Sequence, residues 1–202
     1  MGKFVTYNLE ILTVIMFSAI TFIAALVPHA SMVQRIMVVY MLLYTLHEWE
    51  ENRYPGGFSN IMEGIIGKTF SEEAKELSHI PVFVLLVAIL FLPCIFDSVI
   101  VLAFIPVFLG LFEGFVHTMG VKLSNAEKFY TPGMVTAYCL FGFSAFVICY
   151  FVIHKMATAA EFGLGFLCMV LSFAIMQNRV LAINGVKYRD MIYVMRSKVL
   201  KK

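Results

Sequence analysis

The stretch IMVVYMLLYTL (Ile36–Leu46) runs directly into HEWEE (His47–Glu51). A long apolar run is typical of a helix that crosses lipid, whereas a histidine and three carboxylates are costly to hold at the edge of a hydrophobic helix. Ionisable groups in such a position usually have a function. We therefore expect a transmembrane helix over about 32–51 that ends in a polar site.

The rest of the chain shares the apolar character of this stretch. Of its 202 residues, 61% are hydrophobic and 14% are charged, whereas soluble domains average about half and a quarter. This composition predicts an all-α, polytopic membrane helix bundle whose main partner is the lipid bilayer. The net charge of +2 is too small to indicate a nucleic-acid partner, and no pattern in the sequence specifies an oligomeric state.

Six apolar runs approach or exceed the length that a membrane crossing requires. They predict helices over about 8–27, 32–51, 80–96, 98–119, 133–153 and 160–176. A further short helix is expected over 72–77, after a capping-box pattern that begins at Thr69. Residues 1–176 would then form a transmembrane domain, followed by a basic tail over 177–202.

The lysines and arginines are divided unequally between the predicted loops. If the N-terminus is cytoplasmic, only Arg35 and Lys155 lie on the outer side, and the tail holds the largest group of cations. Cytoplasmic loops carry an excess of Lys and Arg, so this distribution favours that orientation. We expect both termini in the cytoplasm, as an even number of helices requires.

Polar side chains are expected to meet near the cytoplasmic leaflet. His47, Glu50 and Glu51 stand at i, i+3 and i+4, so they share one helix face, and Glu113 and His117 form a second i, i+4 pair. The predicted topology brings these two groups to the same depth. It also places His79, at the start of the helix over 80–96, at that depth.

Imidazole and carboxylate ligands together suit zinc, iron or manganese. The zinc motif H-x-x-E-H uses its two histidines as ligands, and this chain has Glu51 in place of the second histidine. By analogy, Glu50 would be the general base. The predicted metal ligands are His47, Glu51, His79, Glu113 and His117. Together with Glu50 these residues make six candidate ligands, which would suffice for one metal or two. A plain ion pair between Glu113 and His117, without a metal, is an alternative.

These residues resemble the bacterial HXXEE-domain membrane proteins. The resemblance rests on His47–Glu51, the following Tyr54–Phe58, Glu113–His117 and Tyr130–Gly133. It implies a location in the bacterial inner membrane and a shared polar motif at His47, Glu50 and Glu51, but it supplies no reaction.

Three functions are compatible with this pattern. The leading hypothesis is a metal-dependent enzyme, either a hydrolase or a di-iron-type oxidase, that acts on a lipid or another hydrophobic small molecule. The second is a small proton-coupled transporter, and the third is a non-catalytic membrane partner or immunity protein. The outer halves of the predicted helices are nearly all apolar, which counts against a transport path.

Overall fold

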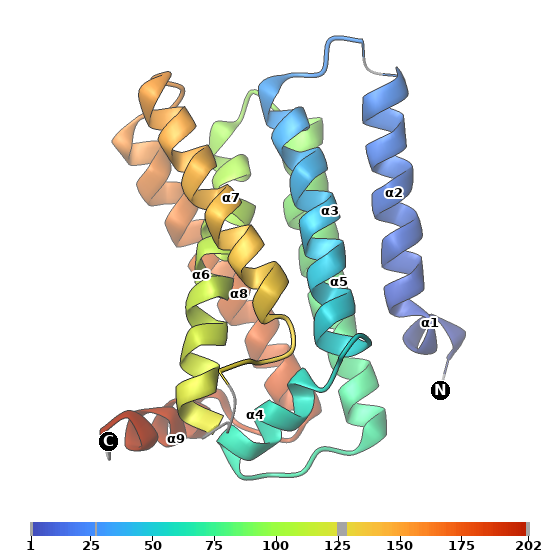
Figure 1. Ribbon diagram of the computed structural model, residues 1–202, viewed down its shortest axis with the longest axis vertical. Helices are drawn as coiled ribbons and strands as arrows, with labels where there is room; N and C mark the ends of the chain where they lie inside the picture. The colour runs from blue at the N-terminus through green and yellow to red at the C-terminus, as the bar shows by residue number, and fades with distance from the viewer. Residues whose placement is uncertain (1, 27, 125–128, 201–202) are drawn as a thin grey trace.

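The computed structural model describes residues 2–26, 28–124 and 129–200, and it is all-helical (Figure 1). The predicted all-α class is confirmed, and the described residues contain no strand. The elements are α1 (Lys3–Thr6), α2 (Asn8–Leu26), α3 (Met32–Asn52), α4 (Phe58–Ile66), α5 (Glu72–Ile95), α6 (Ile100–Ser124), α7 (Met134–Ile153), α8 (Ala159–Ile183) and α9 (Tyr188–Leu200).

The long helices α2, α3 and α5 to α8 run along the bundle in alternating directions, and α1 and α9 lie at the same end of it (Figure 1). Five of them, α2, α5, α6, α7 and α8, are long and apolar enough to cross a membrane. The chain is thus a helical protein with the character of a membrane protein. Helix α3 has similar length, but Arg35 and the polar residues of its last turns reduce its mean hydropathy.

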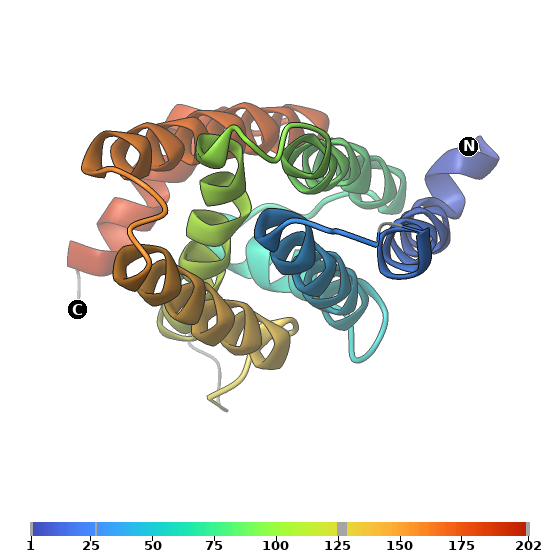
Figure 2. The same ribbon diagram turned by 90° about the horizontal axis from the view of Figure 1, so that it is seen from above.

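The view along the bundle places α6 between α7 and α8, and places α2 at the edge next to α3 and α5 (Figure 2). Close packing of α6 depends on small residues. A side chain at Gly114 would bring its Cβ to 2.9 Å from Phe141 Cβ on α7, and one at Gly110 would collide with Ser144. Small residues at helix contacts are typical of membrane bundles, where they let backbones approach closely.

Three helices extend several residues beyond the bounds that their sequence patterns predict. Helix α5 starts at Glu72 and continues through His79 and Pro81, instead of forming separate helices over 72–77 and 80–96. Its N-cap is Ser71, whose Oγ accepts a hydrogen bond from Ala74 N at 3.1 Å, and not Thr69. Proline lacks one N–H, and a membrane helix tolerates that loss where neighbouring groups compensate.

Helix α8 also continues past residue 176 into the segment predicted as a tail, because no glycine or proline interrupts it before Gly185. Helix α9 follows and lies across the end of the bundle (Figure 1). Helix α6 extends to Ser124, beyond the predicted 119. Residue 27, at the predicted end of the first helix, and residues 201–202 of the predicted tail lie outside the described part of the chain.

Two tyrosines orient α3 toward α6 and α7. Tyr40 and Tyr44 are almost completely buried, with exposed fractions of 0% and 1%. The Tyr40 hydroxyl shares a hydrogen bond with Ser144 Oγ at 2.8 Å, and Tyr44 donates to the Pro106 carbonyl oxygen at 2.7 Å. Because His47 follows Tyr44 by three residues, these bonds point the polar end of α3 in the same direction.

Candidate metal centre

Two histidines and two glutamates from α3 and α6 meet at the end of the bundle near α4. The Nε2 atom of His47 lies 3.6 Å from Glu51 Oε1 and 3.7 Å from Glu113 Oε2. The Nε2 atom of His117 lies 3.1 Å from Glu51 Oε1 and 3.9 Å from Glu113 Oε2. We call these four side chains the His/Glu cluster. Both imidazoles thus direct the same ring nitrogen toward both carboxylates.

The His/Glu cluster is nearly closed to solvent on its histidine side. His47 and His117 expose 3% and 0% of their side-chain surfaces, whereas Glu51 and Glu113 expose 14% and 17%. The buried Nε2 of His117 forms no hydrogen bond of good geometry, although Glu51 Oε1 lies 3.1 Å from it. Buried polar atoms are nearly always paired, so an unpaired nitrogen beside two carboxylates requires an explanation.

One threonine before α7 and one in its first turn each contact the Nδ1 side of one imidazole. His47 Nδ1 lies 2.9 Å from Thr136 Oγ1, and His117 Nδ1 lies 2.9 Å from Thr131 Oγ1. Metal-binding histidines usually form such a hydrogen bond through the ring nitrogen that does not bind the metal. The arrangement therefore leaves both Nε2 atoms free for a ligand.

Glu50, the predicted general base, lies outside the His/Glu cluster. Its carboxylate accepts hydrogen bonds from Tyr130 Oη at 2.9 Å and Val135 N at 3.2 Å. It also accepts from Thr136 N at 2.8 Å and from Thr136 Oγ1 at 2.6 Å. Burial, together with the hydrogen bond to Glu50, raises the pKa of Tyr130 to about 12, so its hydroxyl stays protonated and donates.

The other polar residues of this region occupy separate positions. The ligand atoms of His47, Glu113 and His117 all lie within 4.8 Å of one another, and His79 on α5 is not part of that group. Glu48 is buried, at 7% exposure, and accepts a hydrogen bond from Asn52 Nδ2 at 3.2 Å. The sequence patterns did not reveal its burial.

Trp49 points away from the His/Glu cluster and joins α3 to α2. Its Nε1 donates a hydrogen bond to Thr13 Oγ1 at 2.8 Å, and its ring stacks on Tyr54 with 5.9 Å between ring centroids. Near this contact with α2, Arg53 and Glu10 form an exposed ion pair, with 3.2 Å between Arg53 Nη2 and Glu10 Oε1. Trp49 thus has a packing role at the helix end.

The glycine between the two threonines packs directly over the His/Glu cluster. Gly133 has φ +90°, and a Cβ on it would lie 2.6 Å from Glu51 Cγ, 2.7 Å from His117 Cε1 and 3.0 Å from His47 Cε1. On another side, the ring of Phe58 from α4 lies 5.2 Å from the His117 ring. The segment before α7 and helix α4 therefore enclose the histidines.

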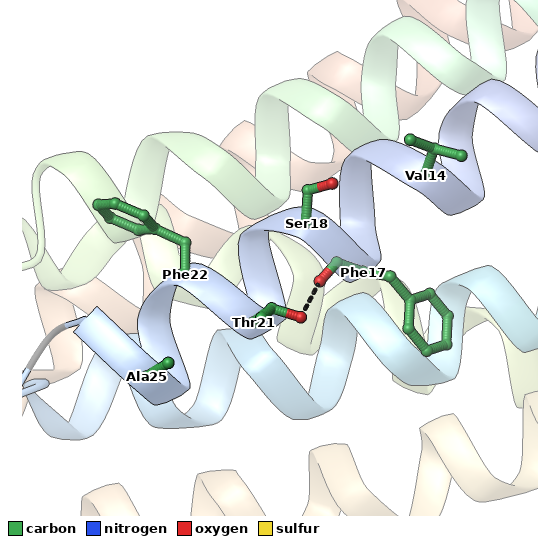
Figure 3. Close-up of a pocket in the computed structure, with 6 residues that line it drawn as sticks. All are labelled: Val14, Phe17, Ser18, Thr21, Phe22 and Ala25. Atoms are coloured by element: carbon green, nitrogen blue, oxygen red, sulfur yellow. Dashed lines mark hydrogen bonds between the residues drawn. The ribbon is translucent and has the colours of Figure 1, made fainter.

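Two surface hollows lie elsewhere in the molecule. One is a shallow groove along the outward face of α2, lined by Val14, Phe17, Ser18, Thr21, Phe22 and Ala25 (Figure 3). The hydroxyl of Thr21 in this groove donates to the Phe17 carbonyl oxygen of its own helix, at 2.8 Å. The other is lined by Ile23, Ala24, Pro28, Ala30, Arg35 and Val38. Neither hollow holds a histidine or a carboxylate.

Comparison with known families identifies the part of the chain that carries the His/Glu cluster. Residues 38–150 match the profile of a family described as proteins of unknown function with an HXXEE motif. The chain belongs to the HXXEE family. The motif letters fall on His47, Glu50 and Glu51. The curated proteins and the solved structures compared with the chain gave no significant match.

The residues that support the HXXEE motif were not predicted as site residues. Thr131 and Gly133 lie in a segment that carries the family resemblance, and Thr136 follows it closely, but the sequence patterns gave none of the three a role. The available signal was the dense polar and glycine content of Tyr130–Thr136, directly before an apolar helix. That content is also typical of a simple turn, so only the fold shows that the segment closes over the His/Glu cluster.

The substitution Gly133→Ala is expected to destabilise the protein more than Gly57→Ala. Both glycines have a left-handed backbone, with φ +90° and +95°, so both changes strain the chain. Only position 133 adds a collision with the His/Glu cluster, since the nearest atom to a Cβ at Gly57 is 3.7 Å away. Overpacking of this kind costs about 1–3 kcal/mol. Thermal unfolding in detergent measures the difference, and equal melting temperatures would contradict the described packing.

Proposed function

We propose that this HXXEE protein is a membrane-embedded, metal-dependent enzyme of the hydrolase type that acts on a lipid or another membrane-dissolved substrate. The observation that supports the proposal best is the approach of His47 Nε2 and His117 Nε2 to Glu113 Oε2, at 3.7 and 3.9 Å, with the ligand atoms of these three residues all within 4.8 Å of one another. Tetrahedral zinc with bonds of about 2.0–2.2 Å places its ligand atoms roughly 3.3–3.6 Å apart. The three side chains would therefore need to close only slightly around a single divalent ion.

The three proposed ligands are His47, Glu113 and His117, whose ligand atoms are all mutually close. Two histidines and one glutamate also form the donor set of several hydrolytic zinc sites, which keep a fourth position open. The buried Nε2 of His117 supports this assignment, because it forms no hydrogen bond of good geometry with the carboxylates beside it and a metal would supply a partner. A divalent ion in such a site supplies a hydrolytic nucleophile at neutral pH by lowering the pKa of water.

Glu51 is proposed as the general base. Its Oε1 lies 3.1 Å from His117 Nε2 and 3.6 Å from His47 Nε2, so it lies beside the proposed ligands and is partly open to solvent. A carboxylate in that position can accept a proton from the reacting group. Glu50 already accepts four hydrogen bonds. This assignment gives Glu51 the role of general base that the H-x-x-E-H analogy predicts for Glu50, and Glu50 is then neither a ligand nor the base.

The same geometry favours one metal over two. A di-iron-type oxidase would need about six ligands, but Glu50, Glu51 and His79 do not belong to the group of mutually close ligand atoms. Three side chains remain in that group, which is enough for one ion with an open position. We therefore favour the hydrolase over the oxidase.

The proposed placement in the membrane uses six crossings. Helix α3 runs beside α2 and α5 along the same bundle, so a membrane that holds the five apolar helices would also contain most of α3 (Figure 1). With an even number of crossings, both termini lie on one side, which the arginine and lysine distribution assigns to the cytoplasm of a bacterial inner membrane. The basic segment 177–202 would then lie partly at the cytoplasmic surface, as α9.

The alternative functions receive less support. A proton-coupled transporter needs polar groups along the bundle, but the interior at the end away from the His/Glu cluster is apolar. It contains the fully buried Leu90, Phe104, Val107 and Phe151. A non-catalytic partner or immunity protein would use the His/Glu cluster only to hold helices together. In that case, Glu51 would complete a closed shell of four ligands.

Metal analysis tests the proposed ligands. Wild-type protein loaded with zinc and desalted is expected to retain about one zinc per chain, as measured by plasma mass spectrometry. His117→Ala and Glu113→Gln are expected to lose most of it, because each removes a proposed ligand. His79→Ala is the matched control and is expected to keep the wild-type content. Full zinc retention in His117→Ala, or none in the wild type, would contradict the assignment.

Cobalt substitution separates an open site from a closed one. If the metal has three protein ligands, azide is expected to bind the cobalt-substituted protein and change its visible absorption, since catalytic sites keep an open position. Glu51→Gln is then expected to retain the metal. An unchanged spectrum with azide, combined with metal loss in Glu51→Gln, would favour the closed, non-catalytic site.

A further inference from the structure

We propose that Glu50 and Thr136 are positioning residues that fix the proton of His47 on Nδ1 and so direct the Nε2 lone pair toward the metal. This inference rests on the proposed metal site and adds a role for the first glutamate of the HXXEE motif. It is carried by a continuous chain of contacts, from the Glu50 carboxylate through the Thr136 hydroxyl to the His47 ring.

The Glu50 carboxylate is anchored at the start of α7. Two of its four donors are the backbone N–H groups of Val135 and Thr136, in the first turn of that helix. The first N–H groups of a helix have no partner within the helix, and the helix dipole favours a negative charge there. Glu50 is thus held as a hydrogen-bond acceptor by the fold.

The single proton of the Thr136 hydroxyl decides the direction of the next bond. Thr136 Oγ1 lies 2.6 Å from Glu50 Oε2 and 3.2 Å from the Gly133 carbonyl oxygen, and neither of these groups can donate. The hydroxyl proton must therefore point to one of them. Toward His47 Nδ1, at 2.9 Å, the threonine oxygen can only accept, so Nδ1 carries the proton.

A proton on Nδ1 has a direct consequence for the other ring nitrogen. In a neutral imidazole with a proton on Nδ1, Nε2 carries the lone pair. Because Nε2 lies 3.6 Å from Glu51 Oε1 and 3.7 Å from Glu113 Oε2, the lone pair of this neutral form would face both carboxylates. Electron pairs that face one another in this way are stabilised by a cation between them. The chain from Glu50 to His47 therefore prepares this histidine for a metal.

A purely structural role for the same contacts makes a different prediction. Glu50 caps α7 and joins it to α3, so a change at Glu50 alone would affect both stability and metal binding. Thr136→Val separates the two roles, because it keeps the backbone donors to Glu50 and the volume of the side chain while it removes the hydroxyl. Thr136→Ser restores the hydroxyl. Thr45→Val is the matched control, since its buried hydroxyl bonds only to Met41 O of its own helix.

The experiment measures the zinc dissociation constant of the full chain in detergent by chelator competition, together with the visible spectrum of the cobalt-substituted protein. Thr136→Val is expected to weaken zinc binding about 10- to 100-fold and to alter the cobalt spectrum, as loss of such supporting contacts does at other metal sites. Thr136→Ser and Thr45→Val are expected to bind zinc as the wild type does. The metal-free Thr136→Val and Thr45→Val proteins are expected to melt at similar temperatures.

Two results would overturn the inference, and they differ in meaning. If the wild type binds zinc and Thr136→Val binds it equally well, with an unchanged cobalt spectrum, the positioning role is wrong while the metal site stands. If the wild type binds neither zinc nor cobalt, the proposed function is wrong, and the positioning role falls with it.

Discussion

The approach of two imidazole nitrogens to two carboxylate oxygens, at one end of an otherwise apolar bundle, is the constraint on which the rest of this structure depends. Removing an ionised carboxylate from water costs several kcal/mol, and a nearby cation must compensate. His47 and His117 are almost completely buried, with exposed fractions of 3% and 0%. Water therefore does not stabilise the charge of the carboxylates on the side that faces these histidines. The surrounding elements hold these groups together, and a divalent ion would balance their charge.

The fold achieves this through contacts that lie on both sides of the His/Glu cluster. On the apolar side, Tyr40 and Tyr44 fix the rotation of α3 through hydrogen bonds to α7 and α6. On the polar side, the hydroxyls of Thr131 and Thr136 contact the Nδ1 atoms of the two histidines, and Gly133 has no side chain that would collide with their rings. The HXXEE motif thus combines three features on one helix: the proposed metal ligand His47, the anchor to α7 at Glu50, and the cluster carboxylate at Glu51.

Much of this arrangement follows from the sequence. Helical spacing places His47 and Glu51 on one face, and the alternation of long apolar helices brings them to the depth of Glu113 and His117. The separate tasks of Glu50 and Glu51 cannot be predicted from the sequence. The directions of adjacent side chains differ by only about 100° around the helix axis, so either carboxylate could face the histidines. The neighbouring helix decides which carboxylate meets the histidines, and that information is not local.

His79 shows a second limit of sequence reasoning. Its predicted place in the cluster assumed a helix that starts at about residue 80, whereas α5 starts at Glu72 and carries His79 in its interior. The direction of a side chain near a helix start depends on where the helix begins, and Pro81 wrongly suggested a start. The threonines were missed for another reason: their partners lie 89 and 14 residues away in sequence, and threonine before a helix is common as a cap.

An anomalous diffraction experiment on zinc-loaded crystals would show whether the His/Glu cluster binds a metal. Data collected on both sides of the zinc absorption edge locate the ion independently of any assumed ligand. The account predicts one anomalous peak within bonding distance, about 2.0–2.2 Å, of His47 Nε2, His117 Nε2 and a Glu113 carboxylate oxygen. A peak elsewhere, or crystals whose His47 and His117 bind no metal, would contradict it.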